Sequence, residues 1–168
     1  MPVRVVGTTI VKHLPKHLRP RWRYLAVALE TWPDADLDRD QFQRAVWQSA
    51  RTLLGDAGTA PLDLSVFQFD VANGQGTALV RTRRGTVEAA RASLACLSTI
   101  GEDPVGIRVA GVSGTVRACE EKYMGRHRVH QEQRDVAFAD AERTAFLREG
   151  RADVRLDGTF AGATTLDI

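Results

Sequence analysis

The N-terminal half of the chain contains a segment whose hydrophobic side chains alternate with period two, Arg21–Glu30. This period places successive side chains on opposite faces of a strand. Pro33 follows shortly afterwards and ends the strand, because proline has no backbone N–H to donate to a central ladder. One face would carry Leu25, Val27 and Leu29, and the other Trp22, Tyr24, Ala26 and Ala28.

Two later segments repeat their hydrophobic residues at helical spacing and therefore predict helices. The first begins with a capping-box pattern, Asp38 followed by Gln41, and Gly55 and Gly58 are expected to end it. Its stripe consists of Phe42, Val46, Ser49 and Leu53, widened by Ala45, Ala50 and Leu54. The stripe of the second helix consists of Val87, Ala90, Leu94 and Leu97.

Three further strands are predicted over residues 62–70, 77–83 and 105–112, and the sequence NGQG between the first two of them indicates a hairpin. A third helix is expected after Gly111–Thr115, with Val116, Cys119 and Tyr123 on one face. The order strand-helix-strand-strand-helix-strand-helix is that of the split βαβ fold. The predicted class is α+β, ferredoxin-like or RRM-like: a four-stranded antiparallel sheet with helices on one face and the other face open for a partner.

The predicted domain covers residues 12–124 and leaves a segment at each end. Residues 1–11 form an apolar leader, and we expect translation to begin at Val11, which would make the first ten residues a start-site artefact. Residues 125–168 form a charged C-terminal extension. A helix is expected over about 131–148, and no regular structure is expected over residues 151–168.

Charge is sorted along the chain, although the net charge is only +2. The first 29 residues contain six Lys and Arg and no acidic residue, whereas the next eleven contain five acidic residues against Arg39 alone. A cluster of positive charge indicates a polyanionic partner.

Other features of the sequence point to a cytoplasmic protein. Cys96 and Cys119 lack metal-ligand spacing and are expected to be buried free thiols in a reducing compartment. The sequence shows neither an apolar run of membrane-spanning length nor a signal-peptide core, and we expect no membrane partner.

Basic residues form three constellations that could bind a polyanion. In residues 12–24, cations that could neutralise phosphates interleave with aromatic rings that could stack on unpaired bases. A second group ends the third strand, next to the first strand in this fold, so the two groups could form one basic zone. The third follows the Gly111–Thr115 loop, whose backbone N–H groups could face an anion. The three sets are Lys12, Lys16, Arg19, Arg21 and Arg23 with Trp22 and Tyr24; Arg81, Arg83 and Arg84; and Arg117 and Lys122.

Each constellation also has an ordinary structural explanation, namely a solvated arm, an exposed strand end and a common strand-to-helix loop. The sequence contains no Walker loop, no dinucleotide fingerprint in context and no nucleophile elbow. Glu120 and Glu121 are adjacent and point apart on a helix, and His13 and His17 have no third ligand. The sequence therefore predicts a binding protein with no catalytic residues and no metal site.

Three segments of the sequence closely resemble the archaeal ribonuclease P protein component 2 family, in the version seen in halophilic archaea. The segments are KHLPKHLRPRWRYLAV, NGQGTALVRTRRG and GIRVAGVSGTVRACEEKY. The resemblance covers residues 12–124. It implies a protein subunit of the enzyme that removes the 5′ leader from precursor tRNA, with the chemistry carried by an RNA subunit that uses Mg²⁺. The protein itself would bind no cofactor. Its partners would be ribonuclease P RNA, precursor tRNA within the complex, protein component 3 and other subunits.

The resemblance also implies roles for particular residues. The arginines of the first two constellations, with Lys12 and Lys16, would contact RNA phosphates, and Arg117 and Lys122 would do so more weakly. Trp22 and Tyr24 would either stack on RNA or pack against a protein partner.

Two other kinds of protein share the predicted fold. A small-molecule-binding ferredoxin-like domain is disfavoured, because it needs no basic segment such as residues 12–23 before its first strand. A general single-stranded RNA-binding module expects aromatic residues on both central strands, whereas residues 77–83 contain none.

Overall fold

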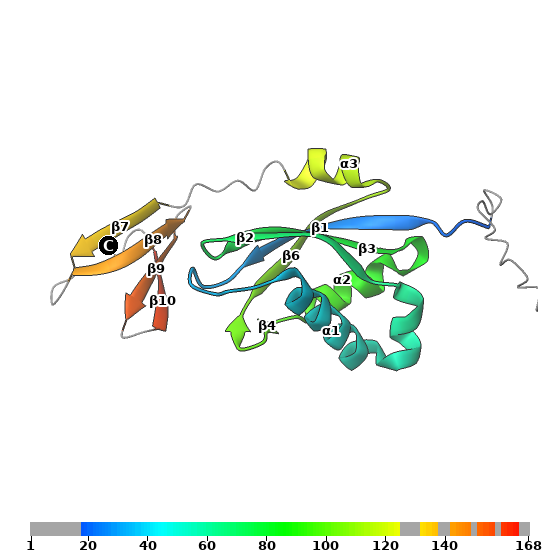
Figure 1. Cartoon of the computed structure of the whole chain (residues 1–168), viewed down its shortest axis with the longest axis horizontal. Helices are drawn as coiled ribbons and strands as arrows, with labels where there is room; N and C mark the ends of the chain where they lie inside the picture. The colour runs from blue at the N-terminus through cyan, green and yellow to red at the C-terminus, as the bar shows by residue number, and fades with distance from the viewer. Residues whose placement is uncertain (1–17, 125–131, 138–141, 149–150, 157–158, 165–168) are drawn as a thin grey trace, which may run out of the picture.

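The computed structural model describes residues 18–124, 132–137, 142–148, 151–156 and 159–164 (Figure 1). Residues 18–124 form a four-stranded antiparallel sheet with the order β2-β3-β1-β6, which confirms the predicted split βαβ fold. The elements are β1 (Trp22–Glu30), α1 (Arg39–Thr59), β2 (Ser65–Ala72), β3 (Gln75–Arg83), α2 (Val87–Ala95), β4 (Thr99–Ile100), β5 (Asp103–Pro104), β6 (Gly106–Ser113) and α3 (Val116–Cys119). Short 3₁₀ turns lie at Ala60–Leu62 and Arg84–Thr86, and a π-helical turn at Glu120–Met124 extends α3.

The main hydrophobic core lies between the sheet and helices α1 and α2, which both cover the same face (Figure 1). Leu25, Val27 and Leu29 of β1 are buried in it, as the alternation predicted. Phe42 of α1 is fully buried and its ring stacks on that of Phe69 at 5.1 Å between centroids. The capping box of Asp38 and Gln41 begins α1 as predicted.

Two details of the predicted helices and strands were wrong, and the end of α1 differs slightly from the prediction. Leu53 is 45% exposed and does not belong to the buried stripe of α1. Gly55, with a φ of 68°, interrupts the helix as predicted, and one further turn follows and ends at Thr59, next to Gly58. Leu62 belongs to a 3₁₀ turn before β2 because Pro61 favours a helical φ at this point.

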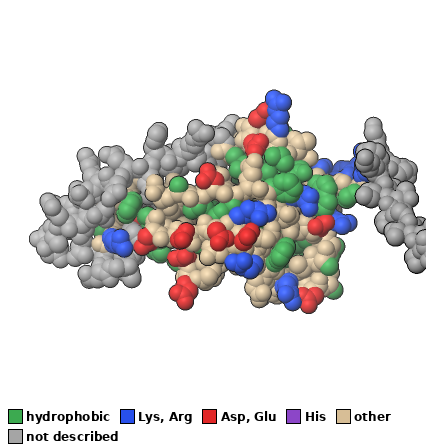
Figure 2. All heavy atoms as spheres, in the orientation of Figure 1, with side chains coloured by type: hydrophobic (Ala, Val, Ile, Leu, Met, Phe, Trp, Pro, Cys, Tyr) green, Lys and Arg blue, Asp and Glu red, His purple; other side chains and the backbone are tan. Residues whose placement is uncertain are grey.

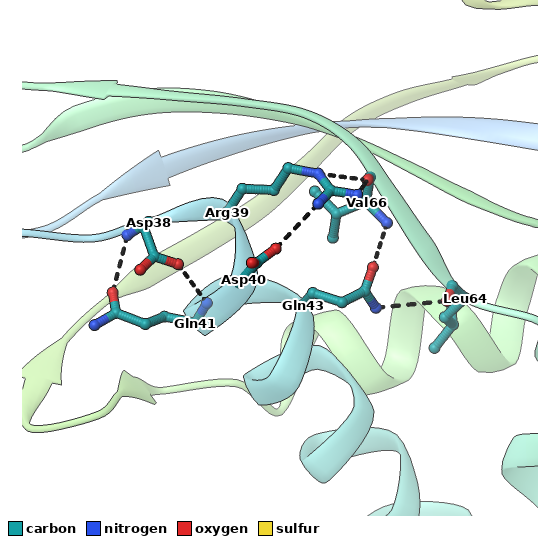
Figure 3. Close-up of polar contacts among 7 residues, drawn as sticks. All are labelled: Asp38, Arg39, Asp40, Gln41, Gln43, Leu64 and Val66. Atoms are coloured by element: carbon teal, nitrogen blue, oxygen red, sulfur yellow. Dashed lines mark hydrogen bonds and ion pairs between the residues drawn. The ribbon is translucent and has the colours of Figure 1, made fainter.

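Side chains of α1 bind the backbone at the start of the edge strand β2 (Figure 3). Arg39 donates from Nε and Nη2 to the carbonyl oxygen of Val66, at 3.1 and 2.8 Å. The side-chain oxygen of Gln43 accepts from the N–H of Val66 at 2.6 Å, and the indole N–H of Trp47 donates to the carbonyl oxygen of Leu64 at 3.0 Å. These bonds fix α1 against β2 in addition to the hydrophobic contacts.

Helix α3 packs on the face of the sheet opposite to α1 and α2 (Figure 1). It covers a small cluster in which Ala26, Leu79 and Cys119 are buried, with Tyr123 packed against them. The sequence predicted an open second face, and the structure corrects this: only part of that face is open. The predicted stripe of Val116, Cys119 and Tyr123 is the surface that α3 and its π-helical turn use.

Gly111 is the residue that lets α3 lie this close to the sheet. A Cβ atom built on Gly111 would lie 2.3–2.5 Å from three ring atoms of Tyr123, a distance that real contacts do not reach. The aromatic ring therefore rests directly on the backbone of β6.

The two cysteines differ in exposure. Cys119 is buried, and its thiol donates to the carbonyl oxygen of Tyr24 with Sγ and oxygen 3.3 Å apart. Burial raises the pKa of the Cys119 thiol above its ordinary value. Cys96 is exposed because it caps the end of α2, so the prediction of two buried thiols was wrong for this residue.

The C-terminal extension contains four antiparallel strands in sequential order: β7 (Glu132–Ala137), β8 (Glu142–Arg148), β9 (Arg151–Leu156) and β10 (Thr159–Thr164). The predicted helix over 131–148 was wrong, and so was the expectation of no regular structure after residue 150. In β9, Ala152 and Val154 are buried while Arg155 is exposed, which is the period of a strand. The extension touches the first domain through an ion pair of 3.6 Å between Arg155 and Asp34.

Substituting Gly111→Ala should destabilise the fold, because the new methyl group displaces the Tyr123 ring and with it α3. Overpacking of this kind costs about 1–3 kcal/mol, measurable as a lower midpoint of thermal or urea unfolding. Gly85→Ala is the matched control, since a Cβ there has no atom within 4 Å. Equal stability of the two variants would contradict the close contact.

Alkylation of the native protein should modify Cys96 quickly and Cys119 slowly, since the second thiol is buried and its raised pKa keeps it protonated. Mass spectrometry of peptides after a timed reaction with iodoacetamide measures the modification rates of the two cysteines. Equal rates at pH 8 would show that Cys119 is accessible.

The raised pKa of Cys119 also makes the free energy of unfolding depend on pH. Its contribution to stability is complete below the unfolded pKa, about 9.0, and declines as the pH rises above that value.

Candidate nucleic-acid interface

The register between β1 and β3 decides which basic and aromatic residues share a face. Trp22 pairs with Arg83 and Tyr24 pairs with Arg81, so these four side chains project from the same side. This is the side on which α3 packs, at the end where β1 begins. Figure 2 shows hydrophobic side chains gathered there with Lys and Arg close by, whereas acidic side chains form a row over the other half of the view.

The guanidinium group of Arg81 lies between aromatic rings. Its central carbon is 3.9 Å from the ring centroid of Trp22 and 5.1 Å from that of Phe67. Its Nε is buried and has no hydrogen-bond partner within the described residues. Cation–π attraction of this kind contributes about 0.5–2 kcal/mol and leaves the positive charge without a counter-ion.

Phe67 reaches this face because β2 contains a β-bulge. Val66 pairs with Val80 and Gln68 with Leu79, which leaves Phe67 without a partner on β3. Strict alternation would have placed Phe67 with Phe69 on the same face. Instead Phe69 enters the core and Phe67 remains 46% exposed.

Sequence reasoning missed Phe67, because a bulge is not visible in a hydrophobic pattern. The one available signal was VFQF, in which two aromatic residues compete for one face. The ring of Tyr24 meets that of Phe67 edge-on, at 5.8 Å and 89°. We call Trp22, Tyr24, Phe67 and Arg81 the arginine–aromatic cluster.

The predicted single basic zone divides between two faces of the sheet. Arg23 pairs with Thr82, which is buried on the face covered by α1 and α2, so Arg23 does not share the face of Arg81. The guanidinium of Arg23 instead donates to the carbonyl oxygen of Trp22 at 2.9 Å.

Arg21 and Arg84 lie together just beyond the ends of β1 and β3. The N–H of Arg84 donates to the carbonyl oxygen of Arg21 at 2.8 Å. Both residues are exposed. In the part of the chain that the structure describes, neither side chain has an ion pair, so their charges are available for an anionic partner.

The remaining predicted cations are less available or lie elsewhere. Arg83 pairs with Asp63 at 3.3 Å and Arg117 pairs with Glu121 at 2.7 Å. Lys122 is exposed on the π-helical turn and Arg19 is exposed before β1. Lys12 and Lys16 lie outside the described residues, so their role stays a prediction.

The Gly111–Thr115 loop, which the sequence suggested as an anion site, contains residues that are explained by the packing and capping of α3. Gly111 is needed to accommodate the ring of Tyr123. Thr115 caps α3, and its hydroxyl oxygen accepts from the N–H of Ala118 at 3.2 Å. The helix that follows has only four residues.

Two features are absent from the described residues. They include no helix that is long and apolar enough to cross a membrane. They also include no group of three or more His, Cys, Asp or Glu side chains placed to hold a metal ion.

The chain belongs to the Rpp14/Pop5 family, whose model matches residues 23–124. It is 57% identical over 157 residues to ribonuclease P protein component 2 of Halorubrum lacusprofundi, covering 94% of this chain and 99% of that protein. Identity to the protein of the same name from Natronomonas pharaonis is 59% over 158 residues, covering 94% and 98%. The Pyrococcus horikoshii protein of that name is 32% identical over 117 residues, covering 70% of this chain and 94% of its own length. These findings confirm the resemblance drawn from the sequence.

Removing Arg21 and Arg84 should flatten the salt dependence of RNA binding. The slope of log K against log[salt] is negative, and each lost phosphate contact reduces its magnitude by about 0.7–0.9. The magnitude should therefore fall by about 1.5 in the double variant Arg21→Gln and Arg84→Gln, measured by filter binding at several KCl concentrations. Arg117→Gln is the control, since Glu121 already neutralises that charge. An unchanged slope in the double variant would mean that these arginines face no phosphate.

Proposed function

We propose that this chain is a protein subunit of ribonuclease P that assists the removal of the 5′ leader from precursor tRNA. The family membership of residues 23–124 supports this, as do relatives named ribonuclease P protein component 2 that align over 94% of the chain. The alternatives, a small-molecule-binding domain or a general single-stranded RNA-binding module, are not favoured by this family membership.

In this proposal the RNA subunit performs the hydrolysis with Mg²⁺, and the protein contributes neither a catalytic residue nor a cofactor of its own. The observation that carries the proposed role is the set of arginines beside the open part of the sheet face. Arg81 has no counter-ion among the described residues, and Arg21 and Arg84 are exposed without ion pairs there. Such cations screen repulsion between RNA strands that must pack closely.

The proposed partners are ribonuclease P RNA, precursor tRNA within the assembled enzyme, protein component 3 and the other protein subunits, in the cytoplasm. Helices α1 and α2 cover one face of the sheet and α3 covers part of the other. RNA would therefore approach from the end where β1 begins, and α1 and α2 would remain for protein partners.

Purification of the tagged protein from its host, followed by sequencing of the bound RNA, tests this function. Ribonuclease P RNA should be strongly enriched over its share of total RNA, and the eluate should cleave precursor tRNA at the mature 5′ end. A tagged unrelated RNA-binding protein from the same host is the control. Recovery of bulk mRNA alone would overturn the proposal.

A further inference from the structure

We propose that the arginine–aromatic cluster is a binding site for one unpaired nucleotide of RNA. The base would stack on the exposed ring of Phe67, and the phosphate would accept hydrogen bonds from Arg81. This inference rests on the proposed function only in taking RNA as the partner.

The first argument is the exposure and orientation of Phe67. Phe67 is 46% exposed on the sheet surface, and within the cluster it contacts Tyr24 and Arg81. The edge-on contact with Tyr24 at 89° holds the ring in a fixed orientation. A fixed and exposed aromatic face is what a nucleobase needs for stacking.

The second argument is the set of unused donors on Arg81. Arg81 is half-buried, and the described residues offer it aromatic rings and no acceptor. The buried Nε shows that no side chain or backbone group of the described residues satisfies this guanidinium. Its two Nη groups are not buried and also have no acceptor there, so an anion can reach them from the surface, whereas Arg83 already has Asp63 as a partner.

The third argument concerns the kind of ligand. A base within a duplex has both faces covered by its neighbours, so only an unpaired base can offer a face to Phe67. The open area is also small, since α3 covers Leu79 and Ala26 immediately beside the cluster. One nucleotide fits these limits better than a helical stretch of RNA.

The experiment compares two short single-stranded RNAs that differ only in their bases: oligoadenylate, and the same strand with abasic sites in its central positions. Both carry the same phosphates, so the difference in affinity isolates base stacking. Fluorescence anisotropy with the full-length chain should show about tenfold tighter binding to oligoadenylate, the effect of stacking one base.

Phe67→Leu should abolish this tenfold preference while leaving the affinity for the abasic strand unchanged. Arg81→Lys should weaken binding to both strands about fivefold, because the ammonium group loses the planar pair of donors. The controls are Leu53→Ala and Arg44→Lys, an exposed apolar side chain and an exposed arginine on α1, on the other side of the sheet. Circular dichroism spectra of all four variants establish that they are folded.

A preference for bases that survives in Phe67→Leu would overturn the proposal, and so would the absence of any preference in the unaltered chain. If Phe67→Leu keeps its RNA affinity but no longer captures another ribonuclease P protein, the cluster docks protein and the proposal is wrong. Enrichment of ribonuclease P RNA with the tagged Phe67→Leu variant separates the two claims. Normal enrichment without a base preference removes this site and leaves the subunit function standing.

Discussion

The contact between the Tyr123 ring and the backbone of Gly111 determines how the second face of the sheet is used. It allows α3 to lie directly on β1, β3 and β6, and it buries Ala26, Leu79 and Cys119. The remaining area of this face is the end where β1 begins, and Trp22, Arg81 and Phe67 lie there. A bulkier residue at position 111 would shift α3 and so change the shape of the remaining surface.

The arginine side chains of the sheet and of α3 are oriented by two different kinds of interaction. Arg83 and Arg117 are paired with carboxylates, and exposed pairs of this type contribute about 0–1 kcal/mol while cancelling the charge. Arg81 is held by aromatic rings, which orient a guanidinium with comparable energy and leave its charge intact. The protein thus keeps an oriented cation where a polyanion would approach, without an acidic residue that the polyanion would have to displace.

The sequence was sufficient for the split βαβ order, for the two faces of β1 and for the capping box of α1, because each depends on local periodicity. It was insufficient wherever register or packing between distant segments decides the outcome. The pairing of Arg23 with Thr82 separates Arg23 from Arg81, and the bulge at Phe67 adds an aromatic ring to the candidate site. The helix predicted over 131–148 is wrong for the same reason, because β7 and β8 form through pairing with each other and with β9.

The hydrogen bonds from α1 to β2 have a consequence for the protein before it meets any partner. An edge strand normally offers unpaired N–H and C=O groups on which another chain can add a strand, and this is a common route to aggregation. Here the side chains of Arg39, Gln43 and Trp47 already occupy the polar groups of Val66 and Leu64. A second copy of the chain would have to break these bonds before it could extend the sheet at this point, so the start of β2 is protected against self-association.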